Sequence, residues 1–519
     1  MDFILAVLFL VLYYVRPHEW LAPMAAFQPV TKVLALGLAV VIFKIGRRVH
    51  WRPHRIAAEF LRTPNDWALL AFTAWMLYAA VDMRSVWAEF YPLLAYYLLV
   101  RHAASTPRRM EVFMWVWLGL LLFISTMAVL SEYDIDPFGS ASFTHGMYKG
   151  RLTLNLSIFN NPNALGHSVV MILPMIYFLG IWHRMLLFKE LSLPLFTMPV
   201  WCLFWTQSKG AYISGAVGLL VSQTFGRPKW LQIVVVGAVY GLGASALMLL
   251  PRMHDLESVR SDAGVKGRLF AWNFAYQSFV TLPKGLGFQQ FTKRVPAYGQ
   301  GEFRVHKPTH SSYVEVGAEL GKGGLLAWLS ILYFSMRVLV LGKTETDQEE
   351  RIRRLLFCLV VIYMASSWMT NISYRGTFFI QTAVVAAFAS HLRRRRAPAA
   401  AVDESRQPAA VPDAEFGGAV GPTPVLLGPP APSLPLGMGS ALMRTPARGA
   451  LPALLATTPD AADAGGAEES ESSPSWSDVT RSLRWRRLAV LLLDVLLIYL
   501  MYRVVIRAWL YFMLDWTGV

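Results

Sequence analysis

The sequence has little cysteine and little charge. Its 519 residues include two cysteines, Cys202 and Cys358, and both lie inside apolar segments. Neither fits a disulfide framework or a zinc site, so cysteine chemistry is excluded. Only 16% of the residues are charged, whereas ordinary soluble domains carry about a quarter. A large soluble core is therefore excluded as the main architecture.

The chain is rich in apolar sequence instead. Hydrophobic residues make up 55% of it, and the mean hydropathy is +0.41. Apolar runs recur along most of the length, so we predict an all-α, polytopic integral membrane protein with about 12–13 transmembrane helices and one large periplasmic loop. The expected spans lie near residues 2–15, 29–43, 66–81, 86–100, 111–130, 166–182, 193–207, 210–225, 230–250, 311–336, 355–370, 376–390 and 488–514.

Basic residues predict the orientation of these spans, because translocation of Lys and Arg is disfavoured. The first segment, DFILAVLFLVLYYV, lacks a basic n-region and a cleavage site, and is expected to remain as the first span. Clusters of Lys and Arg then fall on alternate connections, for example around Arg48, Arg101 and Arg393. This alternation puts the N-terminus inside and two long connections, residues 131–165 and 251–310, outside.

We expect five regions along the chain. These are an N-terminal transmembrane region (1–192), a core with the outer loop 251–310 (193–341), further transmembrane helices (342–396), a cytoplasmic linker (397–478) and a basic C-terminal segment (479–519). The linker is rich in Ala, Pro, Gly and Ser, a composition typical of disorder. The C-terminal segment is interpreted as a final span, with an interfacial basic helix as the alternative. A chain ending near Ala400 is expected to insert and to act.

The second outer loop is basic. Between Pro251 and Lys307 it has nine cations against four acids, a net charge of +5. A long soluble loop can escape the positive-inside rule, but Arg and Lys are also the side chains that hold phosphate. Its glycine turn at Gly285 and Gly287 is expected to present backbone amides to an anion. Trp272, one turn after Arg268, is expected to serve in packing rather than in ligand stacking.

Two further cations lie at predicted outer ends of spans, Lys209 in TQSKGAYIS and Arg375 in NISYRGTFF. Each is either an interfacial side chain that reaches toward water or a cation at the depth of a lipid phosphate. Together with the loop, three separate elements place cations at one membrane face.

The stretch HSSYVEVGAELGKGG (310–324) enters the span after the loop. His310 is either a general base at the water interface or a structural residue. Ser311 or Ser312 is expected to cap the helix. The spacing of Gly317 and Gly321 predicts the close approach of another helix.

Acidic residues near the outer face allow two readings. Glu319, in the same stretch, shares a helix face with Glu315 and is a candidate partner of Lys322. Asp134 and Asp136, in SEYDIDPFG of the first outer loop, form either a divalent-metal site or a solvated turn. A transporter is the alternative outside the enzyme classes, but it predicts charged residues within the spans, which are nearly free of them before the linker.

The ordered set SKGAYIS, GRLFAWNFAYQSFVTLPKGLGFQQF and HSSYVEVGAELGKGGLLAWL resembles the core of the O-antigen ligase and polymerase superfamily, over about Leu193–Leu341. The segments VRPHEW (15–20) and FNNPNALGHSVVMILPMIYFL (159–179) resemble a subgroup called O-glycosylation ligase-related, which is associated with exosortase systems. The family more often has Arg where Lys209 stands, so this chain lacks the bidentate fork there.

The resemblance implies a multi-pass glycosyltransferase of the bacterial inner membrane with a periplasmic active face. It would move a glycan from undecaprenyl diphosphate, or a related polyprenyl-diphosphate carrier, to a lipid, protein or glycan acceptor. It would act with inversion and without metal or cofactor, in the lipid bilayer and with no nucleic-acid partner. A polymerase of the same superfamily and a non-enzymatic transporter of lipid-linked glycan are the alternatives. The implied catalytic residues are His310, Arg268 and Lys209, and the expected substrate-binding residues are Arg252, Arg260, Gly285, Gly287, Glu319 and Arg375.

Overall fold

A computed structural model describes residues 1–238, 263–299, 304–406 and 476–517. Regular structure in these ranges is helical except for one small antiparallel sheet of β1 (Ala297–Tyr298) and β2 (Val305–His306). The predicted all-α class is confirmed. Chain contacts divide the molecule into one unit of Met1–Val402 with Val490–Val519 and a second of Asp403–Ala489. The description below concerns the first unit.

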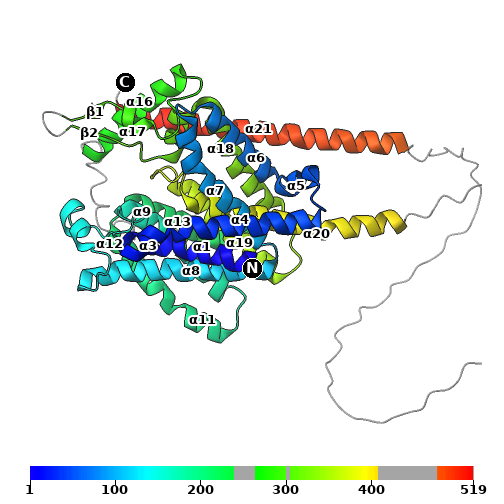
Figure 1. Cartoon of the computed structure of the whole chain (residues 1–519), viewed down its shortest axis with the longest axis horizontal. Helices are drawn as coiled ribbons and strands as arrows, with labels where there is room; N and C mark the ends of the chain where they lie inside the picture. Colours follow the sequence, from blue (N-terminus) through cyan, green and yellow to red (C-terminus); the bar gives the residue numbers. More distant parts are fainter. Residues whose placement is uncertain (239–262, 300–303, 407–475, 518–519) are drawn as a thin grey trace, which may run out of the picture. The chain divides into compact units, whose positions relative to one another are not determined.

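Figure 1 shows the helices in chain order. Those before the second outer loop are α1 (Asp2–Val15), α2 (Pro17–Trp20), α3 (Ala22–Phe27), α4 (Pro29–Arg48), α5 (Pro53–Phe60), α6 (Pro64–Tyr78), α7 (Met83–Ala103), α8 (Pro107–Leu130), η1 (Ser131–Tyr133), η2 (Ser142–Met147), α9 (Pro162–Val170), α10 (Ile172–Ile176), η3 (Tyr177–Ile181), α11 (Leu186–Ser192), η4 (Pro194–Phe196), α12 (Thr197–Thr206), α13 (Lys209–Thr224) and α14 (Lys229–Ala238). Those that follow are α16 (Ala263–Thr281), α17 (Phe291–Arg294), α18 (Ser312–Leu341), α19 (Asp347–Ser366), α20 (Gly376–Arg406) and α21 (Trp476–Thr517).

Every expected span coincides with helix as far as the structure describes it. In the described residues, seven segments are long and apolar enough to cross a membrane: Asp2–Trp20, Pro23–Arg48, Pro107–Tyr133, Pro162–Ile181, Leu186–Thr206, Ser312–Leu341 and Leu488–Leu514. The polytopic membrane architecture is therefore confirmed. The remaining expected spans correspond to α6, α7, α13, α14, α19 and α20, and the larger count of crossings stays a prediction.

Helix starts follow local sequence signals. Helices α6, α8 and α9 each begin at a proline, whose missing N–H costs nothing in the first turn. The residue before each proline caps the helix: Thr63 and Thr106 accept from backbone amides three residues on, and Asn161 accepts from the N–H of Asn163. The cap at Asn161 places α9, which contributes to the site.

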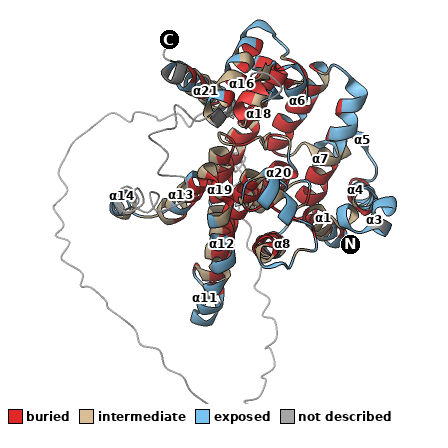
Figure 2. Cartoon of the chain, turned by 90° about the vertical axis from the view of Figure 1, so that its left-hand side faces the viewer, coloured by how far each residue is buried: buried red, intermediate tan, exposed pale blue. Residues whose placement is uncertain are grey.

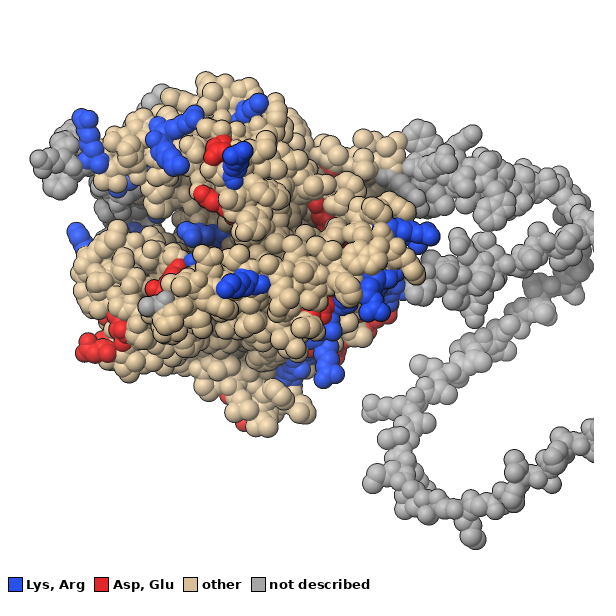
Figure 3. All heavy atoms as spheres, in the orientation of Figure 1, with Lys and Arg blue, Asp and Glu red and all other residues tan. Residues whose placement is uncertain are grey.

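The basic connections assigned to one side of the membrane lie together in the structure. A small pocket is lined by cations from α4, from the connection between α5 and α6, from α7 and from α20: Lys44, Arg48, Arg62, Arg101 and Arg394. Figure 3 shows Lys and Arg gathered at the end of the bundle from which α20 leaves. These loops therefore share one end of the bundle, as the alternation of charge predicts; which compartment they face stays a prediction.

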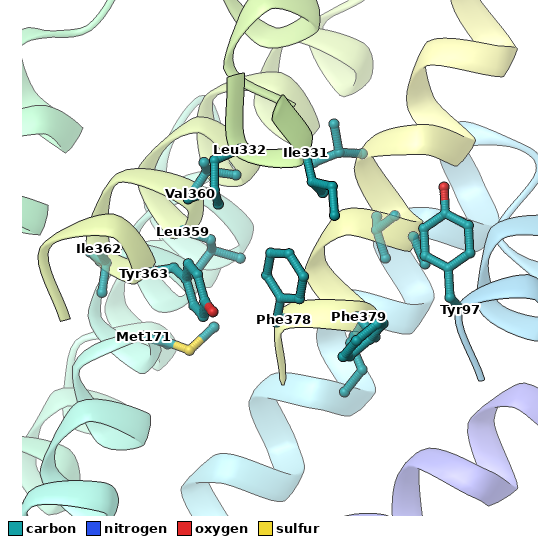
Figure 4. Close-up of a cluster of buried hydrophobic side chains, with 14 of the residues drawn as sticks. Tyr97, Met171, Ile331, Leu332, Leu359, Val360, Ile362, Tyr363, Phe378 and Phe379 are labelled. Atoms are coloured by element: carbon teal, nitrogen blue, oxygen red, sulfur yellow. The ribbon is translucent and has the colours of Figure 1, made fainter. Parts of the chain in front are cut away.

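The buried core is centred on α18, which packs against α6, α16 and α19. Figure 2 shows these elements and α7 mostly buried, whereas α5 and α11 are largely exposed. In Figure 4, Phe378 lies between Tyr363 of α19 and Phe379, and its ring centroid is 5.3 Å from that of Tyr363. This tight aromatic packing holds the elements that meet at the site.

The C-terminal helix α21 contacts this core at a few positions from Asp494 on. Trp509 is fully buried, with its ring 5.5 Å from that of Phe279 in α16. Asp494 forms an ion pair of 2.6 Å with Arg337 of α18. Between residues 490 and 500, α21 exposes leucines and valines on most of its sides, as expected of a helix against lipid. The expectation that a chain ending near Ala400 inserts and acts stays a prediction.

Candidate functional site

A cavity of about 910 Å³ opens between α9, α13, α16, α18, α19 and α21. Its polar lining is confined to one group of residues: Arg151, Asn163, His167, Gln207, Ser208, Lys209 and Arg268. The rest of the lining is apolar or aromatic: Ile213, Val265, Leu269, Trp272, Tyr313, Leu329, Met364, Ala365, Trp368, Met369, Met501, Val504, Val505, Ala508 and Phe512. We call this the large cavity. It combines a cationic end with a long hydrocarbon-like wall.

Lys209 reaches the large cavity because of the turn that precedes α13. Gln207 takes a left-handed conformation (φ 47°), and Ser208 caps α13 by accepting from the N–H of Ala211. Lys209 is therefore the first residue of the helix, beside the positive end of its dipole. Among the described residues no ion pair of Lys209 is found. Lys209 thus lines the large cavity, and its role as a phosphate-binding cation stays a prediction.

A second cation, Arg151, was not predicted from the sequence. Its Nε donates to the carbonyl of Thr206 (3.1 Å) and its Nη2 donates to Oδ1 of Asn163 (2.9 Å). The hydroxyl of Ser208 donates to the same oxygen of Asn163 (2.9 Å). This network joins the first outer loop, α9 and the start of α13. The sequence signal for Asn163 was the segment FNNPNALGH (159–167), which carried a family resemblance but was assigned no role.

Arg268 lines the same end of the large cavity from the first turns of α16. Trp272 follows one turn later and lines the apolar part, where its indole Nε1 donates to the carbonyl of Thr309 (2.7 Å). The expectation that Trp272 serves in packing rather than in ligand stacking stays a prediction. The hydrogen bond also ties α16 to the segment that carries His310.

His310 lies in a separate, smaller cavity of about 320 Å³, whose lining also includes Arg375 and Asn371. Its backbone is left-handed, with φ 50°. Burial, together with the charges of Arg268 and Lys307, lowers the pKa of His310 to about 4. The imidazole is therefore neutral at neutral pH, as a general base must be. The structure thus places His310 and Arg268, which the sequence assigned to one site, in different cavities. Arg268 is still close enough for its charge to affect the pKa of His310.

His167 of α9 lines both cavities and is a second residue that sequence reasoning missed. Its Nδ1 lies 2.8 Å from the hydroxyl of Ser366. Its buried Nε2 has no hydrogen-bond partner among the described residues. A Cβ on Gly210 would lie 3.1 Å from that nitrogen, so Nε2 faces the start of α13 next to Lys209. The imidazole stands where the two cavities meet.

The glycine turn does not present its amides to an anion, and this prediction is wrong. Leu286 and Gly287 donate their N–H groups to the carbonyls of Ala318 and Glu319, at 2.9 and 2.8 Å. Those carbonyls accept from outside the helix because α18 breaks at Gly321 (φ 64°). The N–H of Gly285 bonds within the turn, to the carbonyl of Leu282. Gly285 and Gly287 are therefore structural, since they dock the turn on the kink of α18.

Glu319 is also structural rather than substrate-facing. It is 3% exposed, and its Oε1 accepts from the N–H of Phe291 (3.1 Å). No ion pair with Lys322 is present in the described part of the chain. Glu315, one turn earlier, accepts from Asn371 (2.9 Å) and bonds Ser373. These carboxylates fasten α18 to neighbouring loops.

The serines that enter α18 serve a different purpose from the predicted cap. Ser311 is the N-cap residue but makes no side-chain capping bond, and its hydroxyl donates to the carbonyl of Ser367. The hydroxyl of Ser312 donates to the carbonyl of Thr370 (2.9 Å) and accepts from the N–H of Ile372 (2.8 Å). They tie His310 to the loop before α20, and the cap prediction is wrong.

The remaining predicted residues divide as follows. Arg375 lines the smaller cavity, on the same side as His310. Arg252 and Arg260 lie outside the described residues. The expected close approach at Gly317 and Gly321 occurs: a Cβ on Gly317 would lie 3.0 Å from the indole of Trp509 in α21, and Gly321 meets the glycine turn.

The acidic pair of the first outer loop behaves as a turn. Asp134 is exposed with φ 63°, and Asp136 accepts from the N–H of Ala141 (2.9 Å). Neither lines the large or the smaller cavity. Within the described ranges, no group of three or more potential metal-ligating side chains lies together.

Residues 194–329 match the model of the O-antigen ligase family. The predicted resemblance to the O-antigen ligase superfamily is confirmed for this segment. The matched segment contains Lys209, Arg268 and His310, so it supplies residues to both cavities. His167, Arg375 and helix α21 lie outside it. No curated protein matches the chain. Assignment to the O-glycosylation ligase-related subgroup stays a prediction.

Proposed function

We propose that this O-antigen ligase-type protein is a glycosyltransferase that moves a glycan from a polyprenyl-diphosphate carrier, such as undecaprenyl diphosphate, to an acceptor hydroxyl. The observation that carries the proposal is the large cavity, in which cations at one end adjoin an extended apolar wall. A lipid diphosphate has the complementary form, an anionic head on a hydrocarbon chain. The cations of the large cavity lie on α13 and α16, toward the end of the bundle away from the basic connections near α5 and α20 (Figure 1). We propose that this end faces the periplasm, across the inner membrane from the basic connections.

Lys209 and Arg268 would bind the donor diphosphate. When the bond between the anomeric carbon and the diphosphate oxygen breaks, its electron pair leaves with the diphosphate, whose negative charge rises. Positive groups that are already in place stabilise this charge in the transition state. The bonds from Arg151 to Asn163 and from Ser208 to the same amide hold the start of α13 in position for this role. The chain itself thus supplies the charge that the leaving group needs.

His310 would act on the acceptor in the smaller cavity. As the acceptor oxygen attacks the anomeric carbon, its proton passes to the neutral imidazole, and a single displacement inverts the anomeric configuration. A pKa of about 4 makes a weak base, but Arg268 is one cause of that low value. An anionic donor bound at Arg268 offsets this charge and raises the pKa of His310. Base strength would therefore increase when the donor is bound, which suits proton abstraction near neutral pH.

The smaller cavity is the proposed acceptor site. Asn371 and Arg375 give it polar side chains beside His310, and His167 connects it with the large cavity. The two substrates would approach from opposite sides of His167. Lipid, protein and glycan acceptors all present a hydroxyl of this kind, and a polymerase differs from a ligase only in using the end of another glycan.

The test is transfer by the purified protein in liposomes, with a labelled lipid-linked glycan as donor. We expect a new glycosidic bond, and Arg268→Ala should raise the KM for the donor. Lys266→Ala is the matched control, because Lys266 is exposed on the same helix and does not line the large cavity. Movement of the donor across the bilayer with no transfer would instead indicate a transporter.

A deletion strain separates ligase from polymerase. Loss of acceptor modification with normal glycan length supports the ligase, whereas shortened glycans support the polymerase.

A further inference from the structure

The C-terminal helix α21 lies outside the matched O-antigen ligase segment, yet it lines the large cavity. Its contributing residues are Met501, Val504, Val505, Ala508 and Phe512. Their spacing of three, one, three and four residues follows one stripe of a helix. A neighbouring stripe with Val505 and Trp509 is buried against α16 and α18. One face of α21 thus packs, and an adjoining face borders the cavity.

The surface exposure of the lining shows where the large cavity opens. Val504 of α21 is 64% exposed and Ile213 of α13 is 40% exposed, although both line the cavity. Both side chains belong to helices whose outer faces are apolar, as those of lipid-facing helices are. The opening between them therefore faces the hydrocarbon of the bilayer rather than water.

Further along α21, Phe512 adds to an aromatic part of the lining of the large cavity. The ring of Phe512 lies 6.3 Å from that of Trp272 of α16 and 6.2 Å from that of Trp368, which follows α19. All three rings line the large cavity, and Trp272 follows Arg268 by one turn on α16. An anionic head at Lys209 and Arg268 would leave the first part of its hydrocarbon chain against them.

We propose that α21 is part of the donor site: it holds the isoprenoid chain of the diphosphate donor, and the gap between α13 and α21 is the entrance by which that chain leaves the bilayer. This inference rests on the proposed function for the identity of the donor. It makes the C-terminal segment a substrate-binding element rather than an anchor. Charge at one end and apolar lining along the rest select an isoprenoid diphosphate over a soluble nucleotide sugar, which has no hydrocarbon to bury.

The first test compares two donors that carry the same glycan on a long and on a short polyprenyl diphosphate. Ala508→Trp fills the wall and Val504→Trp narrows the entrance, so each should raise the KM for the long-chain donor by about tenfold, equivalent to ~1.4 kcal/mol. The KM for the short-chain donor should change by less than about threefold, because its head binds beyond the substituted positions. Leu500→Trp, on an exposed position of the same helix that does not line the cavity, is the matched control. Equal effects on both donors, or no effect of either lining variant, would overturn the proposal.

A second measurement does not depend on transfer. A photo-crosslinking amino acid at Val504 should capture a labelled long-chain polyprenyl diphosphate in liposomes, whereas the same amino acid at Leu500 should capture little. If the wild type transfers the glycan from neither donor, the proposed function fails. The crosslinks alone then decide whether α21 binds the isoprenoid chain. Equal capture at the two positions would refute the binding role of α21 even in an active enzyme.

Discussion

Replacement of His310 by asparagine is the most direct test of the proposed chemistry. Alanine is a poorer choice, because His310 has φ 50° and a left-handed backbone costs an alanine about 1–2 kcal/mol. Asparagine tolerates this conformation and keeps a polar group, but it cannot take a proton. We expect His310→Asn to lower the turnover number about a hundred- to ten-thousand-fold, the usual effect of losing a general base. Donor binding should stay nearly intact, since His310 does not line the large cavity.

The pH dependence provides a second readout of the same residue. The pKa of His310 is about 4 in the free protein, so protonation should lower kcat/KM only as the pH falls toward 4. The bound donor offsets the charge of Arg268 and raises this pKa, so the acidic limb of kcat should lie at higher pH than that of kcat/KM. Arg268→Ala should move the limb of kcat/KM upward as well, because it removes one cause of the low pKa.

The assay is transfer in liposomes at saturating donor and acceptor, from acidic to neutral pH, with donor binding measured separately. His310→Asn should show low turnover without the acidic limb. A turnover within about threefold of the wild type at neutral pH, where loss of a base predicts far more, would refute the reasoning and leave His310 a structural residue.

Three further predictions concern charge, backbone and topology. Lys209→Ala should raise the donor Kd, whereas Lys209→Arg should retain or tighten binding because a guanidinium holds phosphate bidentately; equal Kd values in equilibrium binding would contradict this. Gly285→Ala should lower the free energy of unfolding by about 1–3 kcal/mol, because φ is +72° and the new Cβ would lie 2.5 Å from the carbonyl oxygen of Glu319. Gly119→Ala is the control and should not destabilise the protein, because no atom lies within 4 Å of its new Cβ. Thermal unfolding in detergent compares the two, and equal Tm values would be inconsistent with the docked turn. Cysteine at exposed Met147 should react with an impermeant reagent in intact spheroplasts, and cysteine at Glu345 only after permeabilisation; the reverse pattern would invert the topology.

Local patterns in the sequence were enough to predict the helices of this protein. Apolar runs of span length need no distant partner to be recognised, and the expected segments coincide with helices throughout the described residues. The distribution of Lys and Arg grouped connections that the structure brings to one end of the bundle. Lys209 could also be placed at the end of a helix, because the limits of an apolar run depend on neighbouring residues.

Residue types alone could not show which backbone amides and side-chain hydroxyls were already hydrogen-bonded within the protein. The glycine turn has the composition of an anion-binding loop, but its amides bond carbonyls of α18 that only the break at Gly321 makes available. Ser311 and Ser312 have the composition of a cap, yet they bond the loop before α20. In both cases the hydrogen-bond partner is distant in the sequence, so no local sequence pattern could predict it.

The site itself is a product of tertiary structure. His167 stands between two cavities only because α9, α13 and α19 meet there, and a single histidine in an apolar run gives no sign of it. Likewise, α21 is recognisable as a span from its sequence, but its place beside the donor cations depends on Trp509 packing against α16 and α18. The sequence determined which segments form apolar helices and which residue types carry charge. Only the packing of distant helices decided which charges share a cavity, because that depends on side-chain fit across the bundle rather than on order along the chain.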